Sequence, residues 1–163
     1  MALAAIGLGS SLGDRLGNLR RALSLIGAFP GTAVVRASRV VVSPPFGGTA
    51  SAPFLNAVIL VETTLPPLSL LRAGKAAERR LGRRAARRWA DRVIDIDVLV
   101  YEGFALTDGE LVLPHPRIGE RPFVREPLAE VWPDARGLPY RSAVIGGRRP
   151  LPIVATLPRR GRG

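Results

Sequence analysis

Four stretches of the chain carry the short-period apolar pattern of β-strands. They cover residues 2–9, 32–42, 54–63 and 93–101, and they are rich in valine, isoleucine and other apolar residues. The segments between them either repeat their apolar residues with the period of a helix or are rich in proline and glycine. Four strands are therefore predicted, with a further short one over residues 111–113.

Helical periodicity fills two of the gaps between these strands. Apolar residues recur at a spacing of three and four at Leu16, Leu19, Leu23 and Ile26. Residues 68–81 form a second predicted helix, with two prolines before it and Gly82 as its stop. A third helix is predicted over residues 123–132.

The element order is β-α-β-β-α-β followed by a short helical extension, which is the ferredoxin-like pattern. We expect an α+β sandwich in which helices cover one face of an antiparallel sheet and leave the other face for loops and ligands. Length predicts a single domain, 1–163, with a core over about 1–145 and a basic, proline- and glycine-rich tail over 146–163.

Composition narrows the function. The formal net charge is +11, from 24 basic and 13 acidic residues, and Lys75 is the only lysine. This excess favours an anionic partner such as a nucleotide or nucleic acid. The chain has no cysteine and no apolar run of the roughly 20 residues that span a bilayer, so we expect a cytoplasmic protein without a membrane partner.

Two carboxylates interrupt the apolar strand VIDIDVLV at residues 93–100. Side chains alternate faces along a strand, so Asp95 and Asp97 point the same way, while Ile94, Ile96 and Val98 face the core. Two like charges this close favour a bound cation, and oxygen ligands without cysteine favour one or two Mg²⁺ ions together with substrate phosphates. The alternative is an exposed sheet face on which both aspartates meet water.

Cations crowd the chain just before this strand. Seven arginines fall within residues 79–92, and Trp89 lies among them. Arginines beside metal-binding carboxylates suit phosphoryl transfer, which depends on positioning and on neutralising negative charge. The only histidine, His115, lies in the rigid turn LPHPR, with Arg121 and Phe123 shortly after it.

Taken together, these motifs resemble one known family. The chain is similar to 6-hydroxymethyl-7,8-dihydropterin pyrophosphokinases of folate biosynthesis through IGLGSSLGDRLGNLRRAL, SPPFG, PFLNAVILVET, the R-x-x-D-x-D of residues 92–97 and LPHPRIGERPF. The resemblance covers about residues 5–134. It implies transfer of pyrophosphate from ATP to the pterin hydroxymethyl group, with release of AMP.

The resemblance also implies roles for individual residues. Asp95 and Asp97 would bind two Mg²⁺ ions that bridge the phosphates of the co-substrate ATP. Residues on the nucleotide side would be Glu78, Trp89, Arg92, His115 and Arg121. Residues around the pterin would be Ser43, Pro44, Phe46, Phe54, Asn56 and Phe123. Candidates for stabilising charge during transfer are Arg83, Arg84, Arg92 and Arg121, and the choice between Arg83 and Arg84 stays open.

The chain departs from the family pattern at three places. The usual G-S-N of the first turn has Ser11 in its third position, which puts a turn hydrogen bond in doubt. The usual W-G-P-R has Ala90 and Asp91, which removes a preset turn and adds negative charge near the phosphate site. The segment between Gly82 and Trp89 is one residue short.

Two other functions compete with this interpretation. A basic ferredoxin-like sheet is also the architecture of RNA-recognition modules, although their aromatic signature is absent here. A catalytically degenerate family member that only binds is the second alternative. The preferred interpretation takes ATP and hydroxymethyldihydropterin as partners, expects no nucleic acid, and expects a monomer or weak homodimer.

Overall fold

The computed structural model describes residues 1–44, 52–83, 91–132 and 151–152. Its elements in chain order are β1 (Ala2–Ser10), α1 (Arg15–Gly27), β2 (Thr32–Ala37), β3 (Arg39–Ser43), β4 (Phe54–Thr63), α2 (Pro67–Arg80), β5 (Asp95–Tyr101), β6 (Leu106–Thr107), β7 (Val112–Leu113), the 3-10 helix Ile118–Glu120, α3 (Pro122–Val131) and β8 (Leu151–Pro152).

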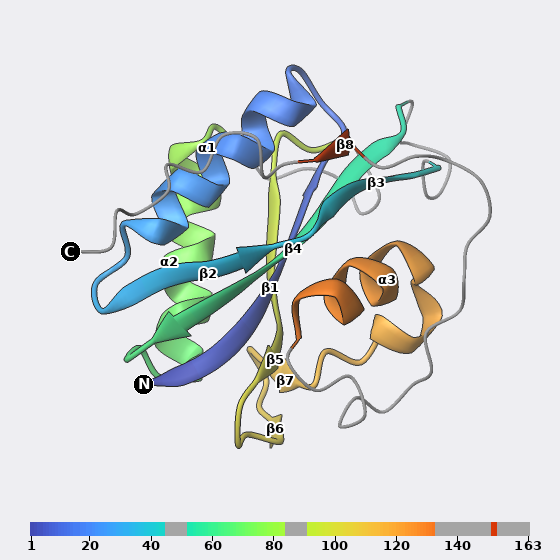
Figure 1. The fold of residues 1–163 in the computed structure, drawn as a ribbon. Coiled ribbons are helices and arrows are strands. Elements are labelled where there is room, and N and C mark those ends of the chain that lie inside the picture. The colour runs from blue at the N-terminus through green and yellow to red at the C-terminus, as the bar shows by residue number, and fades with distance from the viewer. Residues whose placement is uncertain (45–51, 84–90, 133–150, 153–163) are drawn as a thin grey trace.

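The main sheet has the order β5-β1-β4-β3-β8, and β2 also pairs with β4 (Figure 1). All of its strand pairs are antiparallel. β4 therefore lies between β1 and the strands that follow α1, and β1 lies between β4 and β5. This interleaving is that of the ferredoxin-like fold, so the predicted fold class is confirmed.

Helices α1 and α2 cover one face of the sheet and α3 lies on the other (Figure 1). The larger core, against α1 and α2, includes Ile6, Leu19, Ile59 and Ile96. A smaller core on the opposite face is built from residues such as Ala5, Val58, Leu60, Leu99 and Leu128. The sequence left this second face to loops and ligands, but α3 takes part of it because Leu128 and Val131 are completely buried there.

The helices begin where local chemistry favours a start. Asp14 caps α1, since its carboxylate accepts a hydrogen bond from the backbone N–H of Gly17 at 3.0 Å. Pro67 and Pro122 occupy the first positions of α2 and α3, where a missing N–H costs no helix hydrogen bond. Gly82 then adopts φ of 94° directly after α2, which ends that helix as predicted.

The single strand predicted over 32–42 is divided in two at Ser38. Its backbone N–H donates to the carbonyl of Val58 at 2.8 Å, and its hydroxyl accepts from the N–H of Val58 at 2.9 Å. The hydroxyl thus does the work of a backbone carbonyl, so β4 keeps its hydrogen bonds across the break. The sequence did not reveal this break, because the β-rich run VVRASRVVV continues on both sides of Ser38.

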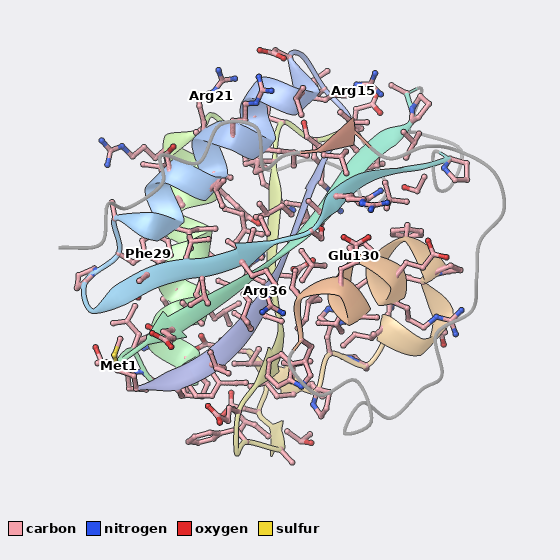
Figure 2. The ribbon with its side chains drawn as sticks, in the orientation of Figure 1. Met1, Arg15, Arg21, Phe29, Arg36 and Glu130 are labelled. Atoms are coloured by element: carbon pink, nitrogen blue, oxygen red, sulfur yellow. The ribbon has the colours of Figure 1, made fainter. Side chains whose placement is uncertain are left out.

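α3 is tied to the sheet at its far end as well as through its apolar face. Glu130, labelled in Figure 2, accepts a hydrogen bond from the backbone N–H of Arg39 at 3.0 Å. Arg39 is the first residue of β3, so this contact satisfies a strand terminus. The C-terminal end of α3 is thereby tied to the start of β3.

No helix in the described parts of the chain has both the length and the apolar character needed to cross a membrane.

Candidate active site

A cavity of about 390 Å³ opens between the sheet and the segment that leads into α3. Of the fifteen residues singled out from the sequence, ten line it: Ser43, Phe54, Asn56, Arg83, Arg92, Asp95, Asp97, His115, Arg121 and Phe123. Pro44 and Glu78 are described but do not line the cavity. Phe46, Arg84 and Trp89 lie outside the described residues.

Two glycines of β1 form the floor of this cavity. Gly9 is the cross-strand partner of both Asp95 on β5 and Asn56 on β4. In the next row of the same face, Gly7 pairs with Asp97 and Val58. Since glycine has no side chain, the sheet surface stays open at Gly9, whereas the Leu99 side chain lies over Gly7, 3.3 Å from where a methyl group would be.

The space above Gly9 is bounded by groups from both sides. A methyl group placed on Gly9 would lie 3.5 Å from the Asn56 side-chain oxygen and 3.6 Å from the Phe54 ring. It would also lie 3.9 Å from the Cβ of Asp95. One ligand lying over Gly9 can therefore touch the aromatic side and the acidic side at once.

Asp95 and Asp97 point into the cavity together, as the alternation of strand side chains predicts. Asp95 is held by two arginines. The distance from Arg83 Nη1 to its Oδ1 is 2.7 Å, and from Arg92 Nη1 to its Oδ2 is 3.3 Å. Each carboxylate oxygen thus has its own cation, which fixes the plane of the group.

Asp97 has a different environment. Removal from water, followed by the charge of Asp95, raises the pKa of Asp97 to about 7, although Lys75 acts in the other direction. The Lys75 ammonium lies 3.8 Å from its Oδ1. Such a pair of close carboxylates is stabilised by a divalent cation, so this donor set fits Mg²⁺.

The described residues contain no group of three or more histidine, cysteine, aspartate or glutamate side chains arranged around one metal position. Two carboxylates alone leave most of a metal's coordination sphere to other oxygens. Mg²⁺ is commonly held this way, by one or two carboxylates together with water and substrate phosphates.

Glu78 lies beneath the cavity rather than in its wall. It is 4% exposed, and its Oε1 accepts from the backbone N–H of Ile96 at 2.7 Å. The same oxygen is 2.7 Å from Arg83 Nη1. Glu78 therefore links α2 to the edge of β5 and helps to place Arg83, a role that the sequence did not indicate.

Of the two arginines left open by the sequence, Arg83 is the one that the structure describes. Burial works against its charge, but Asp95 and Glu78 outweigh that effect and raise the pKa of Arg83 above its usual value. The guanidinium stays positive between two acidic side chains at the cavity wall. It is well placed to exchange one of these partners for a phosphate oxygen.

A hydrogen-bond network fixes the Asn56 side chain. Its Nδ2 donates to Ser43 Oγ at 2.8 Å and to the Val41 carbonyl at 3.1 Å. With the NH₂ group committed to β3, the amide oxygen lies toward Gly9 and the cavity. The site therefore presents an oriented acceptor for an N–H group of a ligand.

His115 is oriented by the backbone around it. Its backbone N–H donates to the Leu99 carbonyl at 2.8 Å, and its ring Nδ1 accepts from the backbone N–H of Arg117 at 3.3 Å. Burial, followed by the charge of Arg121, lowers the pKa of His115. The neutral ring therefore carries its proton on Nε2, which makes His115 a hydrogen-bond donor at the cavity wall.

Several lining residues escaped the sequence analysis. Lys75, Arg117, Gly7 and Gly9 all line the cavity. Lys75 had one available signal, since a lysine three residues before Glu78 shares its helix face. The glycines had none, because their importance comes from their partners on two other strands.

An open glycine floor with paired carboxylates, convergent cations and aromatic side chains defines a class of protein. These features suit an enzyme that transfers phosphoryl groups to a small molecule on a ferredoxin-like sheet. Because aromatic residues and Asn56 lie across the floor from the carboxylates, the acceptor is a flat, polar-edged molecule.

Comparison with known proteins gives the particular family. The sequence model of the family described as 7,8-dihydro-6-hydroxymethylpterin-pyrophosphokinase (HPPK) matches residues 5–133. The chain therefore belongs to the HPPK family. It is a pyrophosphokinase of folate biosynthesis, the class of enzyme that moves pyrophosphate from ATP to hydroxymethyldihydropterin.

Two relatives share much of the sequence. The 2-amino-4-hydroxy-6-hydroxymethyldihydropteridine pyrophosphokinase of Methylorubrum extorquens is 44% identical over 157 residues, which cover 96% of this chain and 94% of that protein. The protein of the same name from Bacillus subtilis is 37% identical over 129 residues, covering 79% and 77%.

Solved structures agree on the fold. A crystal structure of HPPK-DHPS in complex with substrates aligns with a TM-score of 0.64 at 13% identity, covering 80% of this chain and 40% of that one. HPPK-DHPS of Plasmodium falciparum with pterin and p-hydroxybenzoate aligns with a TM-score of 0.58 at 15% identity, covering 76% and 37%. The chain thus spans about 40% of the length of these solved proteins, and the likeness concerns the fold alone.

Proposed function

We propose that this chain catalyses the transfer with divalent cations held by Asp95 and Asp97, and that the substrates meet over Gly9. The observation that carries the proposal is the row Asp95–Gly9–Asn56 across three adjacent strands. It puts acidic groups suited to a metal and polar groups suited to a pterin on one open surface.

Asp95 and Asp97 would hold one or two Mg²⁺ ions together with phosphate oxygens of ATP. When bound, Mg²⁺ neutralises phosphate charge and acts as a Lewis acid on the transferring group. Arg83, Arg92 and Arg121 add fixed positive charge around the same space, and His115 adds a neutral donor. These groups favour the spread of negative charge that develops during transfer.

The pterin would lie between the aromatic side chains Phe54 and Phe123, both of which line the cavity. Its polar edge would donate to the amide oxygen of Asn56, which Ser43 holds in place. Pro44 follows Ser43 directly but lies outside the cavity lining. This arrangement leaves the hydroxymethyl arm of the pterin directed along the glycine floor toward Asp95.

In the transfer, the hydroxymethyl oxygen forms a bond to the β-phosphorus of ATP and gives up its proton to solvent. The bond between that phosphorus and the oxygen bridging to the α-phosphorus breaks, and AMP leaves with that oxygen. The protein contributes by aligning the two ends, since a near-attack geometry alone accounts for a large part of the acceleration.

We also propose that the chain acts as a single domain in the cytoplasm and as a monomer or weak homodimer. One main antiparallel sheet, beside the small two-stranded sheet of β6 and β7, underlies the described parts of the chain and supports the single domain. The absence of cysteine from the sequence suits a reducing compartment.

The test of the proposed function is an AMP-release assay with ATP, Mg²⁺ and 6-hydroxymethyl-7,8-dihydropterin. AMP should form only when all three are present, and chelation of the metal should stop it. AMP formation without the pterin, or unchanged formation in excess chelator, would contradict the proposal.

A further inference from the structure

The ammonium group of Lys75, the only lysine of the chain, lies where α2 meets the cavity. Its Nζ is 3.2 Å from Glu78 Oε1 and 3.3 Å from the carbonyl oxygen of Ile96. The same nitrogen is 3.8 Å from Asp97 Oδ1. Three acceptors from two elements therefore define its position.

Two of these contacts give Lys75 a fixed anchor. β5 forms an edge of the main sheet, and an edge strand exposes backbone groups that need partners. Side chains of α2 supply them at Ile96, where Glu78 accepts from the N–H and Lys75 donates to the carbonyl. The ammonium is thus tied to the body of the fold independently of any ligand in the cavity.

The two carboxylates differ in the cations around them. Asp95 is paired with Arg83 and Arg92, whereas the ion pair recorded for Asp97 in the described part of the chain is with Lys75. The contacts of Lys75 Nζ with Glu78 and with the Ile96 carbonyl hold its charge beside Asp97.

We propose that Lys75 sets the affinity of the Asp95–Asp97 pair for divalent cations by acting as a fixed competing cation at Asp97. The inference rests on the metal role given to these aspartates in the proposed function. A positive charge about 4 Å from a metal-binding carboxylate repels the incoming ion. The free protein therefore binds divalent cations weakly, and tight binding requires the negative phosphates of the nucleotide.

The test uses Mn²⁺, followed by electron paramagnetic resonance, in titrations of the full-length protein without nucleotide, at a pH more than one unit above the Asp97 pKa of about 7 so that this carboxylate is ionised. Lys75→Gln removes the charge but keeps a side chain that can donate to Ile96, and it should bind Mn²⁺ about tenfold more tightly than wild type. Lys75→Arg keeps the charge and should stay within about twofold of wild type. Arg80→Gln, an exposed charge on the same helix, should leave the affinity unchanged.

A merely structural role for Lys75 predicts the opposite sign, because loosening β5 would weaken metal binding and lower Tm. Equal or weaker Mn²⁺ binding by Lys75→Gln, or no binding by either protein, would overturn the inference. Asp97→Ala distinguishes this failure from that of the proposed function. If wild type and Asp97→Ala bind Mn²⁺ equally well, the carboxylate pair is not the metal site and the metal role in the proposed function fails as well.

Discussion

The hydroxyl group of Ser11 donates a hydrogen bond to Asp91, with 3.3 Å between Oγ and Oδ1. These are two of the positions at which the sequence departs from the family pattern, and the structure brings them together. Ser11 Oγ also accepts from the backbone N–H of Arg92 at 2.9 Å, and the Ser11 N–H donates to the Arg92 carbonyl at 2.9 Å. The first turn therefore holds the backbone of a residue that pairs with Asp95.

Loss of the Ser11 hydroxyl should damage both stability and turnover. Ser11 is 3% exposed, so Ser11→Ala leaves the N–H of Arg92 without its acceptor at a cost of about 1–2 kcal/mol. AMP release should fall several-fold, since Arg92 loses its placement. A double-mutant cycle with Asp91→Ala should give a coupling energy of about 0.5–1.5 kcal/mol. If the stability losses of the two single variants simply add, the pairing is contradicted. Ser24→Ala, at an exposed serine, is the control and should leave stability unchanged.

A side chain on Gly9 should block the reaction without unfolding the protein. A methyl group there would make only ordinary contacts, the nearest at 3.5 Å, so Gly9→Ala should keep a Tm within a few degrees of wild type. It would nevertheless occupy the floor between Asn56 and Asp95. We expect AMP release to drop by at least about tenfold, a size typical of small misplacements of reacting groups.

Gly27→Ala is the matched control for this experiment. A methyl group at Gly27 would meet only Val34 at 3.7 Å, outside the cavity. Its AMP release should equal that of wild type. If Gly9→Ala turned over as fast as Gly27→Ala, the substrates would not meet over the glycine floor.

The neutral state of His115 predicts a pH effect on stability. Burial and Arg121 lower its pKa in the folded protein below the ordinary value of about 6.5. Protonation therefore favours the unfolded chain, so the contribution of His115 is present above about pH 6.5 and is lost as the pH falls below it. Thermal unfolding of wild type and His115→Gln between pH 8 and pH 5 measures this directly.

The comparison must use the difference between the two proteins, because Asp97 titrates in the same range with the opposite sign. The Tm of wild type should fall relative to that of His115→Gln as the solution becomes more acidic. A difference that is constant across the range would mean that His115 has no shifted pKa in the free protein.

Strand positions and the direction of Asp95 and Asp97 could be predicted because they depend on local alternation. The strand Phe54–Thr63 has the predicted bounds, and Ile94, Ile96 and Val98 are buried against the helices as expected. The start of α2 followed from its two prolines, because proline constrains only its own neighbours. Such features need no knowledge of distant partners.

Features that depend on partners across the fold could not be predicted. The glycine floor comes from the register of β1 against both β4 and β5, and register is not visible in one strand. Glu78 was placed near the nucleotide by resemblance, but its buried bond to Ile96 follows from β5 being an edge strand. The location of α3 on the second face depends on packing between Leu128 of the helix and sheet residues such as Leu99, which are distant in sequence.

The most direct measurement of the central claim is single-turnover AMP release by Asp95→Ala and Asp97→Ala, with Glu62→Gln as an exposed acidic control. Both alanine variants should fold, as judged by circular dichroism, and should lose at least about a thousandfold in rate because the metal-binding pair is broken. The control should match wild type. A folded Asp95→Ala or Asp97→Ala protein that released AMP at close to the wild-type rate would contradict the metal role of the pair.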